Sequence, residues 1–152
     1  MRKQLLSALN VAVAGVLLMY TSVMHLPDNT NEHANSYHCM VENVWHEARG
    51  EGLRGMHAVA LVTMNRVKQR NKTVCEIVYE AQQFSWTNDV TGDMQDNIVN
   101  VRRAVANVMT GSIRDFTKGA THYHANYVKP YWAKDMKKTV VVGKHIFYRK
   151  QK

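Results

Sequence analysis

Cysteine is scarce in this chain, which has only two among its 152 residues. Two cysteines exclude a miniprotein held by many disulfides and a zinc site with four cysteine ligands, but they allow one bridge. The sequence also lacks internal repeats, and its length suffices for one compact domain but not for two of ordinary size. Hydrophobic residues make up 45% of the chain, a share that excludes wholesale disorder.

Acidic residues are scarce as well, since twelve Asp and Glu stand against twenty Lys and Arg and the net charge is +8. The excess of positive charge is unevenly distributed along the chain. Residues 4–48 contain four acids and no Lys or Arg, whereas residues 49–152 contain eighteen bases and eight acids. A positive balance favours an anionic partner, which can be nucleic acid, acidic lipid or a bacterial envelope polymer.

No charged side chain interrupts residues 5–26, a run long enough to cross a bilayer, and Arg2 and Lys3 precede it. Basic residues before such a run predict that the N-terminus stays in the cytoplasm and the rest is exported. Because no A-x-A cleavage site stands near the end of the run, we favour an uncleaved signal-anchor helix. A cleaved signal peptide and a buried helix of a soluble protein are the alternatives. We therefore divide the chain into a signal-anchor segment (1–26), a polar linker (27–36) and one folded domain (37–152).

Hydrophobic periodicity predicts helices and a small sheet in the folded domain. The expected helices span Tyr37–Arg49, with Ser36 as N-cap, Met56–Lys68, Thr73–Tyr79 and Asn97–Met109. Thr73 and Glu76 form a capping-box pattern. The stretches Thr121–Tyr127 and Thr139–Tyr148 are rich in β-formers and are expected to pair antiparallel, and Gln82–Asp96 is expected to be a loop. The predicted class is α+β, mainly helical with a small antiparallel sheet, preceded by the N-terminal transmembrane helix.

Two glutamates four residues apart, Glu47 and Glu51, stand where the first predicted helix ends. Glu47 falls at the edge of the hydrophobic face, where partial desolvation raises the pKa of a carboxyl group. A carboxyl group that keeps its proton near neutral pH can act as the general acid in glycosidic cleavage. Glu51 follows Gly50, so its side chain can turn away from the helix. The alternative is that both are ordinary surface charges, because E-x-x-x-E is a common pattern.

Several blocks of sequence resemble the SleB/CwlJ-type cell wall hydrolase family in order and spacing. They are HEARGE at 46–51, G-x-x-A-V-A-x-V-x-x-N-R-V at 55–67 and QFS at 83–85, followed by aromatic segments at 119–133 and 143–149. The resemblance implies a fold related to lysozyme-like lytic transglycosylases, no cofactor, and cleavage of peptidoglycan between N-acetylmuramic acid and N-acetylglucosamine. It also implies that Glu47 is the single acid/base. Whether the product is a 1,6-anhydro sugar or a hydrolysed one stays open.

A glycan groove needs aromatic faces for sugar rings and amides for acetamido groups. The residues that we expect to bind substrate are Glu51, Gln83, Phe84, Ser85, Trp86, Tyr123, His124 and Asn126. A place in the core is an equal alternative for the aromatic residues in general, while the resemblance favours the groove for Gln83 and Tyr123. Asp89 is a spare carboxylate whose alternative is a loop turn. Asn65 and Arg66 are expected to be structural, linking their helix to the Glu47 loop.

Histidine and cysteine raise two further questions. His122 and His124 alternate on a predicted strand and with a third ligand would bind zinc, as in a zinc amidase. No third ligand stands at a motif spacing, so we expect no metal. Cys39 and Cys75 can form a disulfide if the domain is exported to an oxidising compartment; in the cytosol they would be two unrelated buried thiols.

The expected function is peptidoglycan cleavage for bacterial lysis, as in phage signal-anchor-release endolysins. The catalytic domain would lie in the periplasm, held at the inner membrane by its N-terminal helix or released from it. The alternatives are a host cell-wall remodelling enzyme, a zinc amidase and a non-enzymatic basic module that binds the envelope. Nucleic-acid binding rests on charge alone, and since an exported domain rarely meets DNA we expect no nucleic-acid partner.

Overall fold

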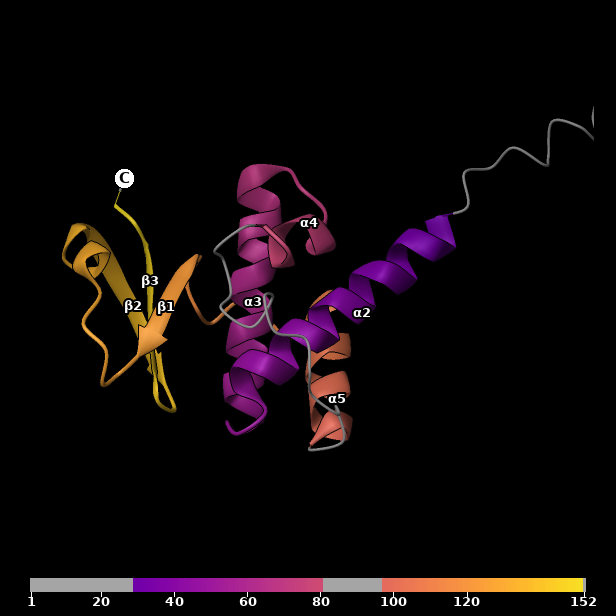
Figure 1. Ribbon diagram of the computed structural model, residues 1–152, viewed down its shortest axis with the longest axis horizontal. Helices are drawn as coiled ribbons and strands as arrows, with labels where there is room; N and C mark the ends of the chain where they lie inside the picture. The colour runs from indigo at the N-terminus through magenta and orange to yellow at the C-terminus, as the bar shows by residue number, and fades with distance from the viewer. Residues whose placement is uncertain (1–28, 81–96, 152) are drawn as a thin grey trace, which may run out of the picture. The chain divides into compact units, whose positions relative to one another are not determined.

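The computed structural model describes residues 29–80 and 97–151 (Figure 1). Its helices are α2 (Asn29–Ala48), α3 (Leu53–Arg70), α4 (Val74–Val78), α5 (Ile98–Met109) and the 3-10 helix η2 (Tyr131–Asp135), and its strands are β1 (His122–Ala125), β2 (Met136–Val142) and β3 (His145–Lys150). The predicted class, mainly helical with a small antiparallel sheet, is confirmed. The predicted signal-anchor segment 1–26 and the loop 82–96 lie outside the described residues. Among the residues that are described, no helix is both long and apolar enough to cross a membrane.

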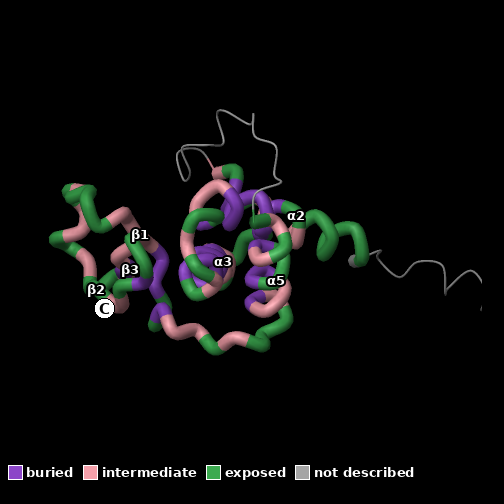
Figure 2. Tube along the Cα trace, turned by 90° about the horizontal axis from the view of Figure 1, so that it is seen from below, coloured by how far each residue is buried: buried purple, intermediate pink, exposed green. Residues whose placement is uncertain are grey.

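Helix α2 begins at Asn29, earlier than the predicted Tyr37, so residues 29–36 of the predicted linker are helical and Ser36 is no N-cap. The sequence between Asn29 and Ala48 contains neither proline nor glycine, so nothing local interrupts a helix there. Residues 30–35 are exposed, and the helix therefore begins with turns that bury no hydrophobic face (Figure 2). The predicted buried face is confirmed further along α2, at Met40, Val41, Val44, Trp45 and Ala48.

Helix α3 occupies the centre of the domain because it is hydrophobic on two sides. Met56, Val59 and Ala60 on one side join the core formed with α2, α4 and α5. On its other side Ala58 and Val62 pack against a second cluster that includes Phe147 of the sheet. A helix buried on opposite sides is expected between two layers, and the helices and the sheet lie on either side of α3 in Figure 1.

Cys39 and Cys75 form a disulfide, with Cα atoms 5.3 Å apart. It joins α2 to the short helix α4, which begins with the predicted capping box: the Thr73 hydroxyl accepts from the Glu76 N–H, and the Glu76 carboxylate accepts from the Thr73 N–H. Helix α4 has only five residues, too few to be stable alone. The cap therefore stabilises its first turn, and the disulfide holds it against α2.

The sheet has the order β1-β3-β2, with both neighbours antiparallel to β3. The stretch Thr139–Tyr148, predicted as one strand, is a hairpin, because Gly143 adopts a positive φ of 54° and turns the chain at Gly143–Lys144. Glycine takes this conformation without steric cost, and it fits the twist of a two-residue hairpin loop. Because a run of valines precedes Gly143, the sequence pattern indicates one continuous strand and not a turn at this position.

Two polar residues of α3 connect this helix to the segment that leads into β1. The Asn65 amide donates to Asp115 Oδ2 at 3.1 Å and to the Ala120 carbonyl at 3.0 Å. Arg66 Nε donates to the Thr121 carbonyl at 2.7 Å. Both residues thus have a structural role, but these hydrogen bonds link α3 to the segment before β1, whereas the prediction was a link to the Glu47 loop.

Candidate active site

Glu47 lies in the last turn of α2, half-buried, and points toward the sheet. The Tyr123 hydroxyl, on β1, donates a hydrogen bond of 2.8 Å to Glu47 Oε2. The two residues are 76 positions apart in the sequence, so the packing of α2, α3 and the sheet creates this pair. One oxygen of the Glu47 carboxylate is thereby held in a fixed orientation.

Tyr123 is positioned by its neighbours on β3. Its ring packs against Phe147 at a centroid distance of 5.5 Å and edge-on against His145 at 5.3 Å. Burial raises the pKa of the Tyr123 hydroxyl well above its ordinary value, and the Glu47 charge and hydrogen bond raise it further. The phenol therefore stays protonated and remains a donor to Glu47 over the whole neutral range.

Arg66 places a buried positive charge behind this pair. Burial lowers the pKa of Arg66 below its ordinary value, while the interactions with Tyr123 and Glu47 act in the opposite direction. An arginine remains charged even so, so Glu47 faces both a neutral donor and a cation. The sequence signal for Arg66 was the N-R-V block, which we interpreted as structural only.

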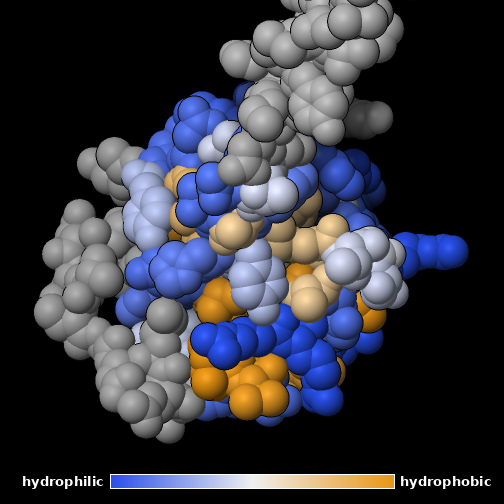
Figure 3. Space-filling model, turned by 90° about the vertical axis from the view of Figure 1, so that its right-hand side faces the viewer, coloured by the Kyte–Doolittle hydropathy of each residue, from blue (hydrophilic) through white to orange (hydrophobic). Residues whose placement is uncertain are grey.

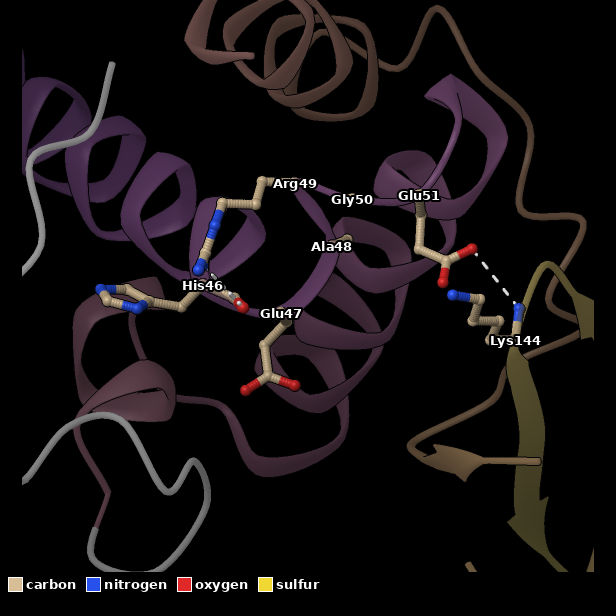
Figure 4. A pocket seen from close by; sticks show the side chains of 7 residues that line it. All are labelled: His46, Glu47, Ala48, Arg49, Gly50, Glu51 and Lys144. Carbon is tan, nitrogen blue, oxygen red and sulfur yellow. Dashed lines mark hydrogen bonds between the residues drawn. The ribbon is translucent and has the colours of Figure 1, made fainter. Parts of the chain in front are cut away.

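Glu51 points away from Glu47, toward the β2–β3 hairpin (Figure 4). Its Oε2 accepts from the Lys144 N–H at 3.4 Å, and its Oε1 lies 3.9 Å from His145 Nδ1. Burial lowers the pKa of His145, and Glu51 opposes that shift. The carboxylate is only 14% exposed and fits because residue 143 is glycine: a Cβ there would lie 1.9 Å from Glu51 Oε2.

A pocket of about 280 Å³ opens between the α2–α3 turn and the hairpin. Its lining residues are His46, Glu47, Ala48, Arg49, Gly50, Glu51 and Lys144. Burial is the main cause that lowers the pKa of His46, so this ring is neutral near pH 7. An open, polar pocket beside a carboxyl group fits one unit of a polymer better than a small apolar ligand.

Arg49 and Asn97 fix the end of α2 that forms this pocket. The Arg49 guanidinium lies 4.2 Å from the centre of the Trp45 ring, a cation–π contact. The Asn97 amide donates to the Arg49 carbonyl at 2.9 Å and so ties the turn after α2 to the start of α5. Glu47 thus lies on a helix end that is held from two sides.

His122 and His124 share one face of the sheet, as predicted, but it is the face opposite Tyr123 and Glu47. His124 stacks on Tyr148 at 5.2 Å, and both histidines contact Trp132. Burial, followed by nearby positive charges, lowers the pKa of His122 to about 4. Within residues 29–80 and 97–151, no three His, Cys, Asp or Glu side chains are grouped so as to hold a metal ion.

The structure brings only some of the predicted substrate-binding residues to Glu47. Tyr123 contacts it, and Glu51 lines the same pocket. Asn126 is exposed after β1, with its N–H donating to the Lys144 carbonyl at 2.7 Å. His124 lies on the other face of the sheet. Gln83, Phe84, Ser85, Trp86 and Asp89 lie outside the described residues.

Comparison with known proteins identifies relatives of this fold. Two solved structures match: the catalytic domain of the germination-specific lytic transglycosylase SleB from Bacillus anthracis, and the catalytic domain of the SleB protein from Bacillus cereus. The first is 27% identical, covers 76% of this chain and 94% of its own, and superposes with a TM-score of 0.63. The second is 26% identical, covers 76% and 91%, and gives a TM-score of 0.60.

A search of curated proteins gives no significant match. The family model described as Cell Wall Hydrolase matches residues 50–148, about two thirds of the sequence. Both SleB catalytic domains are matched over nearly their full length, so the likeness extends over the helices and the sheet together. The chain therefore belongs to the Cell Wall Hydrolase family, with the SleB catalytic domains among its structural relatives.

Proposed function

We propose that this protein cleaves the β-1,4 bond between N-acetylmuramic acid and N-acetylglucosamine in peptidoglycan, with Glu47 as general acid and base. The observation that supports this role is the hydrogen bond from Tyr123, which orients the Glu47 carboxylate beside an open polar pocket. Glu47 precedes the residues matched by the family model, so its assignment depends on this geometry and on the HEARGE motif. The kinship with a lytic transglycosylase supports the substrate.

In the proposed reaction, Glu47 gives its proton to the glycosidic oxygen as the bond from that oxygen to the anomeric carbon breaks. The resulting carboxylate then takes a proton from the C6 hydroxyl of the muramic acid, whose oxygen bonds to the anomeric carbon. The products are a 1,6-anhydro end and a free 4-hydroxyl group, and Glu47 regains its proton. If water replaces the C6 hydroxyl, the same steps give a reducing muramic end.

The position of Glu51 favours the first outcome. A retaining or inverting hydrolase uses a second carboxylate beside the sugar. Glu51 is the nearest acidic residue in the sequence, but its carboxylate contacts the hairpin at Lys144 and His145. Within residues 29–80 and 97–151, this arrangement fits a single acid that relies on the substrate's own hydroxyl. Asp89, the other candidate for a second carboxylate, lies outside the described residues.

Mass spectrometry of muropeptides released from purified sacculi tests the proposal. Anhydro-muramic ends are expected from the wild type, and reducing ends would identify a muramidase instead. Glu47→Gln should release nothing above background, whereas Glu32→Gln, an exposed carboxylate on the same helix, should behave as the wild type. Unchanged release by Glu47→Gln would contradict the role of Glu47, and free stem peptides would indicate an amidase.

For localisation, we propose that residues 1–26 form a signal-anchor that holds the enzyme at the inner membrane of a lysing cell until it is released. The support is the uncharged run after Arg2 and Lys3. Fractionation before and after membrane depolarisation tests this. The protein should move from the membrane to the periplasmic fraction, and a protein that stays membrane-bound and active throughout would contradict release.

A further inference from the structure

Positive charges gather at the end of the sheet that lies farthest from the β2–β3 hairpin turn. Lys137 of β2 and Arg149 of β3 are directly opposite each other in the strand register. Like charges in this position destabilise a sheet, and opposite charges stabilise it. In the part of the chain that the structure describes, neither side chain forms an ion pair. The protein therefore tolerates a local repulsion that a bound anion would relieve.

A pocket of about 230 Å³ has Arg149, one of these two residues, in its wall. It is lined by Gln69, Lys118, Gly119, Thr121, Arg149, Lys150 and Gln151. The lining contains three bases and no acid. Lys150 also borders a neighbouring pocket that contains Asp135, so we assign the positive field of this pocket to Lys118 and Arg149, with Lys137 across the strand pair.

The basic pocket lies on the same sheet face as the Glu47–Tyr123 pair. Tyr123 is paired with Phe147, and Arg149 follows two residues later on β3, so its side chain points to the same face. Tyr123, which contacts Glu47, and Arg149 are separated by about 7 Å along the strands. An extended peptide gains about 3.3 Å for each residue, so a peptide substituent of a few residues on a polymer bound at Glu47 is long enough to cover this distance.

We propose that Lys118, Lys137 and Arg149 form a subsite for a carboxylate of the stem peptide that peptidoglycan bears on its muramic acid. This inference depends on the proposed function, because the substrate must first bind at Glu47. Arginine and lysine bind carboxylates through charge-assisted hydrogen bonds. The subsite binds glycan that carries stem peptides. It takes no part in bond cleavage, which Glu47 performs.

The test compares the affinity of the full-length chain for two substrates, intact sacculi and glycan from which an amidase has removed the stem peptides. Binding is measured on ice in the Glu47→Gln background. Because each partly exposed contact contributes modestly, Lys137→Gln with Arg149→Gln should weaken binding to intact sacculi about five- to tenfold. Binding to the stripped glycan should stay unchanged. Exchange of the two bases, Lys137→Arg with Arg149→Lys, should retain the affinity.

The matched control is Arg102→Gln with Lys129→Gln, which removes the same two kinds of charge from exposed positions elsewhere. This control variant should change the affinity for intact sacculi and for stripped glycan by the same factor. Equal losses on intact and stripped glycan in the test variant would overturn the subsite and indicate general charge attraction. A loss seen only with sacculi that carry phosphate polymers would overturn the carboxylate assignment. Muropeptide release by Glu47→Gln is assayed separately and would contradict only the proposed function.

Discussion

At the scale of single residues, the proposed chemistry depends on one phenol. The Tyr123 hydroxyl donates a hydrogen bond to the Glu47 carboxylate. Tyr123 therefore orients the group that gives and takes the proton in the proposed reaction.

Tyr123→Phe tests this role, since it removes the hydroxyl and keeps the ring that packs on Phe147. A hydrogen bond to a charged group contributes about 1.5–3 kcal/mol, so we expect activity on sacculi to fall roughly ten- to a hundredfold. Because the phenol acts through the orientation of Glu47, the loss should appear in kcat and leave KM nearly unchanged. Tyr148→Phe, on the other sheet face, is the control. An unchanged kcat in Tyr123→Phe would contradict the role.

Gly143 and Gly111 allow a second residue-scale prediction, because both have positive φ, 54° and 74°. An added Cβ at Gly111 meets nothing within 4 Å, whereas at Gly143 it meets Glu51 Oε2. Gly111→Ala should cost about 1 kcal/mol of unfolding free energy from backbone conformation alone. Gly143→Ala should cost about 1 kcal/mol more, because the Glu51 carboxylate must then turn away from the Lys144 N–H.

Urea denaturation measures both alanine variants. Shortening Glu51 to alanine in the Gly143→Ala background should recover part of the extra loss, because the clash partner is removed. Equal costs at Gly143 and Gly111 would show that the Glu51 contact does not restrict the hairpin.

At the scale of elements, the disulfide joins two helices that differ greatly in length. By the chain-entropy model, a bridge across 36 positions contributes roughly 3–4 kcal/mol to stability. Cys39→Ser with Cys75→Ser should lose that amount in urea denaturation, and a reductant should lower the stability of the wild type but not of the double variant. A double variant as stable as the wild type would show that α4 is held by its packing alone.

The sequence predicted elements well where local signals agree. The face of α2 that includes Val44 and the capping box at Thr73 are found as predicted. It failed where tertiary structure decides: α2 extends back to Asn29 without burying a hydrophobic face, and the hairpin at Gly143 lies inside one uninterrupted β-rich stretch. Hydrophobic periodicity identifies the buried face of a helix. It does not locate a helix end whose residues bury no hydrophobic side chain.

The sequence also predicted only part of the candidate site. Glu47 and Tyr123 were named from the resemblance, and the structure places them in contact. Strand alternation, which the sequence does show, predicts that Tyr123 and His124 point to opposite faces, yet both were expected in the groove. The proximity of Arg66 to Glu47 depends on how α3 packs between α2 and β1, and no local pattern reports it.

At the scale of the whole molecule, we expect the net charge of +8 to contribute to binding the proposed anionic polymer. On the side of the domain away from the sheet, hydrophobic side chains appear in separate groups between hydrophilic ones (Figure 3). We expect sedimentation with sacculi to weaken steadily as salt rises, because the Debye length falls from about 10 Å at 0.1 M to about 3 Å at 1 M. Circular dichroism at each salt concentration controls for unfolding. Binding that is indifferent to salt would contradict an electrostatic contribution.

The order β1-β3-β2 has a consequence for synthesis on the ribosome. Both outer strands precede β3 in the chain, and each of them pairs only with β3. Until residues 145–150 have been made, neither strand has a partner, and Tyr123 lacks the Phe147 ring that supports it. The helices can pack earlier, because the buried residues of their common core all come from α2, α3, α4 and α5. A nascent chain would thus present Glu47 without its orienting phenol, and the enzyme would become competent only when its central strand is added.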